Sequence, residues 1–206
     1  MSLYTKSMYT IENHPFDIYI PEYVKYLIIG TFPTNIKNLE FQFYYSGKGN
    51  YFWKIMESVF DYKFKFYSGE DAVIERKAFL SNRKIGITDM HEKCYRKNGL
   101  SSDESLFVIT LRDIFLLLKK HETIDTLILT SRTEVIGALG LLKTYFMQKD
   151  IELKEPQKQG KILITNFTFN GRTIDILVPY SPSPRVIGNN KTNIDEVIEM
   201  YRYCLA

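Results

Sequence analysis

Two short polar loops, far apart in the sequence, carry the residues of this chain that are best suited to chemistry. The first lies between Gly30 and Asn50 and holds hydroxyl groups, paired tyrosines and an asparagine. The second, at 181–185, reads Ser-Pro-Ser-Pro-Arg and is followed by Asn190 and Lys191. Aromatic rings can stack on a planar base, amides and hydroxyls can read its edge or hold water, and basic side chains can bind phosphate. The residue types therefore predict a site for a base taken out of a nucleic-acid stack.

Each loop follows an apolar run that predicts a buried strand. Residues 26–29 read Tyr-Leu-Ile-Ile, and residues 174–178 read Ile-Asp-Ile-Leu-Val. Open α/β sheets bind their ligands outside the carboxyl ends of the strands. We therefore expect the two loops to meet in one cleft that brings Tyr45, Asn50 and Ser181 together.

Predicted strands and helices alternate along the rest of the chain. Apolar spacing and turn residues predict strands at 85–89 and 126–130, helices at 52–60, 71–80, 101–120, 133–148 and 194–203, and a hairpin of residues 161–169 and 173–178 around Asn170 and Gly171. The 101–120 helix is predicted from a capping box formed by Ser101 and Glu104. Thr133 is expected to cap the next helix, and residues 1–25 read as an irregular lead-in. This alternation predicts one domain, 1–206, with a mostly parallel sheet covered on both faces and extended by an antiparallel strand.

Composition indicates an ordinary globular protein. The 206 residues are 45% hydrophobic and 25% charged, which suffices for one domain with a sizeable core. A net charge of +3 is compatible with nucleic-acid binding but does not imply it. The carboxylates show no paired pattern, which argues against a hydrolase that uses two acids.

The sequence predicts neither a metal site nor a membrane segment. Cys94 and Cys204 are too few for an iron–sulfur cluster or a thiolate zinc site, and they suit a reducing compartment. His14, His91 and His121 lack metal-ligand spacing and are expected on the surface or in packing. No signal peptide and no apolar run of about 18 residues is visible. We expect a cytoplasmic monomer that uses no metal or other cofactor.

The first loop resembles a motif of the uracil-DNA glycosylase superfamily. The segment from Tyr45 to Trp53, with Asn50 before Phe-Trp, is similar to the mismatch-specific and hypoxanthine-type branches. The preceding Gly-Thr-Phe-Pro, residues 30–33, resembles the hypoxanthine-type first motif. The resemblance implies that Asn50 is catalytic and places the attacking water, with Tyr45 as the stacking ring. For Asn50 a helix-capping role stays open, and Phe52 and Trp53 are expected in the core.

The second loop resembles a motif of the single-strand-selective monofunctional uracil glycosylases, His-Pro-Ser-Pro-Arg followed by Asn-Lys at the same spacing. This chain has Ser181 at the position of the histidine, which normally stabilises the developing negative charge on the base. A serine hydroxyl is a weaker, neutral donor. The resemblance implies that Ser181 is catalytic and that the remaining motif residues bind DNA together with Lys48. Those motif residues are Ser183, Pro184, Arg185, Asn190 and Lys191.

Further residues are assigned by the same resemblance. Thr31 and Phe32 of the first loop are expected to bind the base. Thr130 and Ser131 stand where superfamily members often carry an asparagine that reads the base edge. A middle segment with Asp89, Cys94, Arg96 and residues 101–103 matches hypoxanthine-type members, in which these positions look mainly structural.

The resemblance implies a three-layer α/β/α fold on a central four-stranded parallel sheet. It also implies an enzyme, a monofunctional DNA glycosylase that hydrolyses the N-glycosidic bond of uracil or another deaminated base in DNA. A catalytically inactive protein that binds nucleic acid or a nucleotide on the same fold is the alternative. An unrelated doubly wound enzyme for a phosphorylated ligand is disfavoured, because the glycine-rich phosphate loops of such enzymes are missing.

Overall fold

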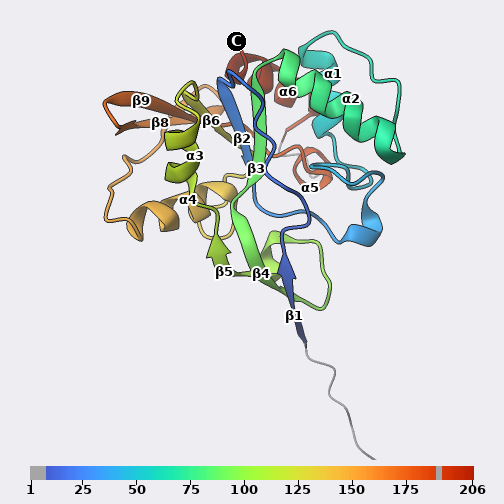
Figure 1. Cartoon of the computed structure of the whole chain (residues 1–206), viewed down its shortest axis with the longest axis horizontal. Helices are drawn as coiled ribbons and strands as arrows, with labels where there is room; N and C mark the ends of the chain where they lie inside the picture. The colour runs from blue at the N-terminus through green and yellow to red at the C-terminus, as the bar shows by residue number, and fades with distance from the viewer. Residues whose placement is uncertain (1–7, 189–191) are drawn as a thin grey trace, which may run out of the picture.

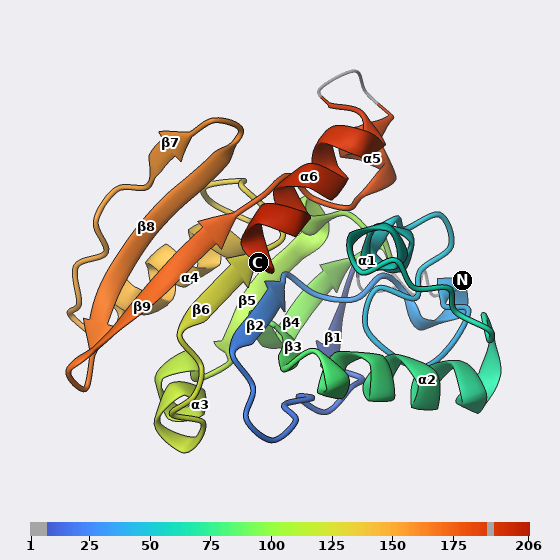
Figure 2. The ribbon, with the colours of Figure 1, turned by 90° about the horizontal axis from the view of Figure 1, so that it is seen from above.

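A six-stranded sheet forms the centre of the molecule. The computed structural model describes residues 8–188 and 192–206. The strand order is β3-β2-β6-β9-β8-β7 (Figures 1 and 2). The strands are β2 (Tyr26–Gly30), β3 (Ile85–Asp89), β6 (Thr126–Leu129), β7 (Gln157–Gln159), β8 (Ile162–Phe169) and β9 (Arg172–Val178). Neighbouring pairs from β3 to β9 are parallel, whereas β8 and β7 add antiparallel pairs. The prediction of a mostly parallel sheet is confirmed, and the sheet is wider than the four strands with one hairpin strand that were expected.

Helices cover both faces of this sheet, which follows from the fully apolar strands at its centre. Side chains alternate along β2, so that Tyr26 and Ile28 face one layer and Leu27 and Ile29 face the other. The first layer contains α1 (Phe52–Val59), α2 (Gly69–Asn82) and α6 (Ile194–Cys204), and the second contains α3 (Ile114–Lys120) and α4 (Ala138–Met147). Figure 1 shows the two layers on either side of β2 and β3. Phe52 and Trp53 of α1 are buried in the first layer.

The hairpin prediction is confirmed in detail. β8 and β9 pair from Leu163 and Val178 to Phe169 and Arg172 around Asn170 and Gly171, whose φ angles are 50° and 75°. These positive values are those that an Asn-Gly turn supplies. Figure 2 shows this hairpin and β7 extending the sheet away from β2 and β6.

The predicted helix over 101–120 is wrong in its first half. A short 3-10 turn, η2 (Asp103–Ser105), leads into strand β5 (Leu106–Leu111), and helix α3 begins only at Ile114. The run Leu-Phe-Val-Ile-Thr is rich in aromatic and β-branched residues, and pairing with β4 (His91–Lys97) decides its conformation. Asp113 caps α3 instead, because its carboxylate accepts from the Leu116 amide.

The structure also differs from the prediction in the N-terminal segment and at the start of α4. The supposed irregular lead-in contains β1 (Tyr9–Asn13), which pairs with β4 to give a second sheet, β1-β4-β5. Thr133 does not cap α4, whose N-cap is Gly137. Within the described residues, no helix is long and apolar enough to cross a membrane.

Arg96 of β4 joins the second sheet to the rest of the molecule. Its side chain is 1% exposed and donates to a Glu12 carboxylate oxygen at 2.8 Å. It also donates to the carbonyl oxygens of Leu100 at 2.6 Å and Pro33 at 2.7 Å. The loop that follows β2 is therefore held against the back of this sheet.

Replacing Arg96 with methionine should lower the free energy of unfolding by about 2–3 kcal/mol, because it leaves a carboxylate and two carbonyl groups without their donor. Urea denaturation measures the change. Lys97→Met, on the opposite face of the same strand, is the matched control and should change stability little. Equal stability of Arg96→Met and the control would show that these bonds do not hold the loop.

Candidate functional site

A cleft of about 560 Å³ opens at the carboxyl ends of the parallel strands. Segments that follow β2, β3, β6 and β9 line it. The residues predicted for the site that line this cleft are Thr31, Phe32, Tyr45, Lys48, Asn50, Thr130, Ser131, Ser181, Ser183, Pro184 and Arg185. Asn190 and Lys191 lie outside the described residues. The two polar loops thus converge, as expected from their places after strands.

A backbone hydrogen bond joins the two loops directly. The amide of Tyr51, at the end of the first loop, donates to the carbonyl oxygen of Pro182 at 3.0 Å. Pro182 is buried, whereas Pro184 and Arg185 are exposed. The start of α1 and the serine-proline turn therefore hold each other in place beneath the cleft.

Tyr45 presents only part of its ring to the cleft. Its ring stacks on Phe52 with centroids 4.2 Å apart and planes at 20°. Its hydroxyl group shares a 2.8 Å hydrogen bond with that of Thr130. Burial raises the pKa of Tyr45 well above its ordinary value, so the phenol stays protonated. A base could stack only on the ring face that Phe52 leaves uncovered.

Asn50 lies one residue before Tyr51, the N-cap of α1, and its side chain bonds to the start of the helix. Its side-chain oxygen accepts from the Phe52 amide at 2.9 Å, at the first residue of α1. An amide oxygen has two lone pairs, so one remains for a water molecule in the cleft. The structure therefore leaves room for both roles that the sequence suggested.

The two serines of the second loop organise its turn. Ser181 Oγ accepts from the Ser183 amide at 3.2 Å, and Ser183 Oγ accepts from the Arg185 amide at 3.3 Å. The latter bond caps the short helix α5 (Pro184–Ile187). Since both hydroxyl oxygens act as acceptors in these bonds, their protons remain available for donation to a ligand.

Two aspartates line the same cleft, and the sequence did not assign chemistry to either. Asp89 ends β3, is 4% exposed and contacts the His14 ring at 2.9 Å. Asp103, on η2, accepts a long hydrogen bond from the Thr31 hydroxyl at 3.4 Å. Desolvation raises the pKa of Asp103 to about 6. For Asp89, its place at a strand's carboxyl end was a usable signal. For Asp103, the matching middle segment indicated only a structural role, and its segment was assigned to a helix.

Two histidines contact residues that line the cleft. His14 forms a hydrogen bond with the Asp89 carboxylate. His91 is 1% exposed and packs edge-on against Phe32. Burial lowers the pKa of His91 to about 4, which keeps this ring neutral near pH 7. No group of His, Cys, Asp and Glu among the described residues could hold a metal ion.

Comparison with known proteins supports the fold. No protein-family model matches this chain, and no curated protein matches its sequence. Among solved structures, the chain is similar to the solution NMR structure of a "putative Uracil DNA glycosylase" from Methanosarcina acetivorans, with a TM-score of 0.61 and 17% sequence identity. The match covers 96% of this chain and 100% of the other. At this identity the likeness shows a shared fold, that of a uracil DNA glycosylase-like α/β protein.

Because Gly30 has no side chain, the Asp89 carboxylate and the Tyr45 hydroxyl can both lie close to its backbone. A Cβ atom there would overlap Asp89 Oδ1 and lie 2.6 Å from the Tyr45 hydroxyl oxygen. We expect Gly30→Ala to lower the free energy of unfolding by about 1–3 kcal/mol, the usual cost of overpacking. Thermal or urea unfolding measures this change.

A double-mutant cycle provides the control for Gly30→Ala. An Asp89→Ala background removes the shorter of the two close contacts and leaves the one with the Tyr45 hydroxyl, so Gly30→Ala should cost less there. An equal cost in both backgrounds would contradict the steric explanation.

Proposed function

We propose that this protein is a monofunctional DNA glycosylase that hydrolyses the N-glycosidic bond of uracil or another deaminated base in DNA. The observation that carries the proposal is the convergence of both polar loops on one cleft of a glycosylase-like fold. That cleft combines an aromatic ring, amide and hydroxyl groups, a partly buried carboxyl and basic residues at its rim. These are the groups that binding and cleaving a flipped nucleotide requires.

In this proposal the base is held by the hydroxyl-rich wall of the cleft. The uncovered face of Tyr45 stacks on the base, next to Phe32. Thr31, Thr130 and Ser131 read the base edge. When the glycosidic bond breaks, its electron pair moves to the base, and the Ser181 hydroxyl donates to the resulting anion.

The attacking water needs an acceptor for its proton as well as a fixed position. Asn50 offers the second lone pair of its side-chain oxygen, which orients the water. Asp103 is ionised above pH 6; the Arg185 charge favours this ionised form, but no ion pair to Asp103 is formed among the described residues. As the water oxygen bonds to the sugar carbon, the Asp103 carboxylate accepts the proton.

Basic residues of the two loops bind the DNA backbone in this proposal. Lys48 and Arg185 are exposed and line the cleft, where they would contact the phosphates beside the flipped nucleotide. Asn190 and Lys191 are proposed to add to this contact. The net charge of only +3 agrees with a modest affinity that falls with salt.

A catalytically inactive nucleic-acid-binding protein is the second candidate. The observation that favours it is that Asn50 and Tyr45 already have hydrogen-bond partners within the protein. The serine in place of the motif histidine points the same way. Both candidates predict binding in the cleft, so only a measurement of base excision separates them.

Substitutions of Asn50 and Ser181 test the enzyme proposal. Asn50→Ala should slow single-turnover excision from oligonucleotides containing uracil, hypoxanthine or xanthine by orders of magnitude, while DNA binding stays nearly intact. Ser181→His should raise the rate on uracil, because a stronger donor then faces the base anion. Alkaline cleavage at abasic sites measures both rates.

The capping role of Asn50 provides the control. If Asn50 only caps α1, its substitution costs about 1 kcal/mol of stability and leaves the rate of the folded protein unchanged. No excision by the wild type on any deaminated base, with none gained by Ser181→His, would favour the inactive binding protein.

The pH dependence tests Asp103. The single-turnover rate should fall about tenfold per pH unit below pH 6, where this carboxyl is protonated, and Asp103→Asn should be slow and flat over the same range. The pKa of Asp103 is higher in the folded protein than in the unfolded chain, because burial disfavours the ionised carboxylate. The free energy of unfolding therefore falls as pH rises from about 4 to 6. Asp103→Asn should therefore melt above the wild type at pH 7 and close to it at pH 4. Glu122→Gln, at an exposed position that does not line the cleft, should leave both profiles unchanged.

A further inference from the structure

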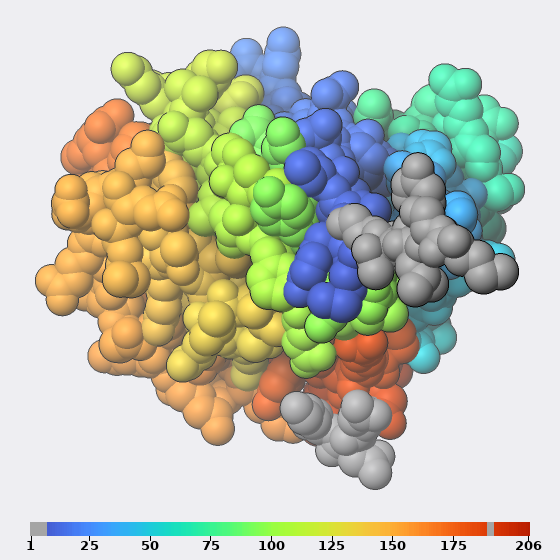
Figure 3. All heavy atoms as spheres, turned by 90° about the horizontal axis from the view of Figure 1, so that it is seen from below, coloured from blue at the N-terminus to red at the C-terminus, as the bar shows by residue number. Residues whose placement is uncertain are grey.

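The outer face of the sheet β1-β4-β5 is apolar and exposed. Register places Ile11 opposite Tyr95 and Tyr95 opposite Phe107, so the three side chains form a row across the sheet. They are 57%, 42% and 46% exposed. Tyr9 packs edge-on against Phe107, with ring centroids 5.5 Å apart. The blue atoms of β1 and the green atoms of β4 and β5 lie side by side on this surface (Figure 3).

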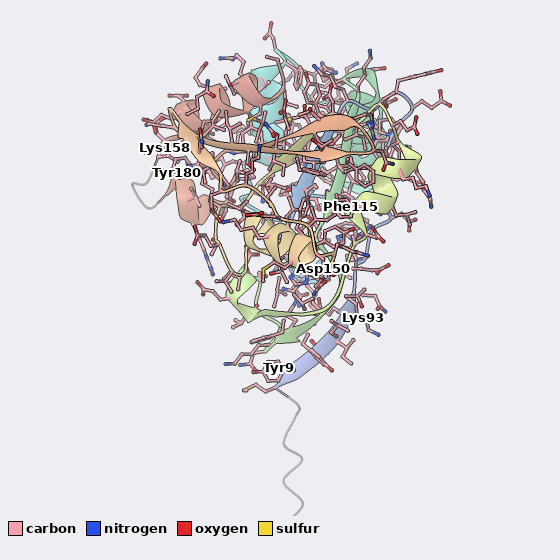
Figure 4. The ribbon with its side chains drawn as sticks, turned by 90° about the vertical axis from the view of Figure 1, so that its left-hand side faces the viewer. Tyr9, Lys93, Phe115, Asp150, Lys158 and Tyr180 are labelled. Carbon is pink, nitrogen blue, oxygen red and sulfur yellow. The ribbon has the colours of Figure 1, made fainter. Side chains whose placement is uncertain are left out.

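The charges on this face have one sign. Lys97 lies opposite Tyr9 and Lys93 opposite Asn13, so the row of Ile11, Tyr95 and Phe107 runs between two lysines. Figure 4 shows Tyr9 and Lys93 on the neighbouring strands at the lower end of the molecule. The described positions of this face, 9, 11, 13, 93, 95, 97 and 107, include no carboxylate. Glu12 of β1 alternates to the other face, where it pairs with Arg96.

We propose that this face binds single-stranded nucleic acid. Its aromatic side chains stand on a sheet, where bases can stack in succession, and its lysines flank the row, where phosphates would pass. A protein partner would gain from the apolar row, whereas the two lysines beside the row favour a partner that also carries phosphates. In duplex DNA the base faces are covered, so the aromatic row selects single strands.

This surface is separate from the cleft but connected to it through Arg96. That side chain lies on the inner face of β4 and holds the carbonyl of Pro33 in the first loop. A strand on the outer face would therefore run behind the wall of the cleft. The proposal does not depend on glycosylase activity, since an undamaged strand has no base to excise.

Fluorescence anisotropy with a labelled, undamaged oligonucleotide of 12 thymidines tests the proposal. Tyr95→Ala and Phe107→Ala should each weaken binding about fivefold or more, the factor that corresponds to about 1 kcal/mol of base stacking. Tyr95→Phe keeps the ring and should bind like the wild type. Lys93→Ala and Lys97→Ala should each lower the slope of log affinity against log salt by about 0.7.

The matched control is Tyr203→Ala, which removes a tyrosine that is 49% exposed on α6. It should leave the affinity unchanged, and circular dichroism should show all variants folded. The proposal is overturned if the wild type does not bind this oligonucleotide, if the double variant Tyr95→Ala/Phe107→Ala binds as the wild type does, or if a duplex of the same length binds equally well. Sedimentation of the same double variant adds a further outcome that overturns the proposal. If the variant loses a dimer that the wild type forms, and its affinity for the oligonucleotide is unchanged, the face is a contact between two copies of this chain.

Discussion

The cleft depends on a close approach of three strand ends around a glycine. Gly30 and Asp89 are paired residues at the carboxyl ends of β2 and β3, and the Thr130 amide donates to the Ile29 carbonyl beside them. The absent side chain at Gly30 lets the Asp89 carboxylate and the Tyr45 hydroxyl enter the space between the strands. Because the polar walls of the cleft begin at these three strand ends and at the end of β9, the spacing of the parallel sheet sets the spacing of the site.

The sequence predicted those features that depend on local pattern and on one rule of sheet topology. Unbroken apolar runs gave the central strands, and the carboxyl-end rule joined two loops separated by more than 130 residues in the sequence. Local pattern failed at 106–111, where leucine, phenylalanine and isoleucine suit a helix as well as a strand. Pairing with β4 decides between them, and that contact is not local. The same error hid Asp103, since its exposure and its neighbours follow from the turn before β5.

Side-chain partners were also beyond the sequence. The sequence placed Phe52 and Trp53 in the core, yet it could not show that Phe52 covers one face of Tyr45 or that the Tyr45 hydroxyl bonds to that of Thr130. These contacts hold the Tyr45 ring in place, but Phe52 covers one of the two ring faces on which a base could stack. A ring held in this way loses little freedom when a base arrives, which favours binding on the face that remains.

Stability and chemistry compete within the first loop. Asn50 holds the start of α1, and the next residue, Tyr51, holds the second loop through Pro182, so a change at position 50 acts on both loops at once. Asp103 instead lowers stability. Its raised pKa means that its ionised form, which the proposed reaction uses, disfavours folding. One residue of the cleft thus strengthens the fold while another weakens it. A measured rate therefore assigns a role only when the stability of the same variant is measured beside it.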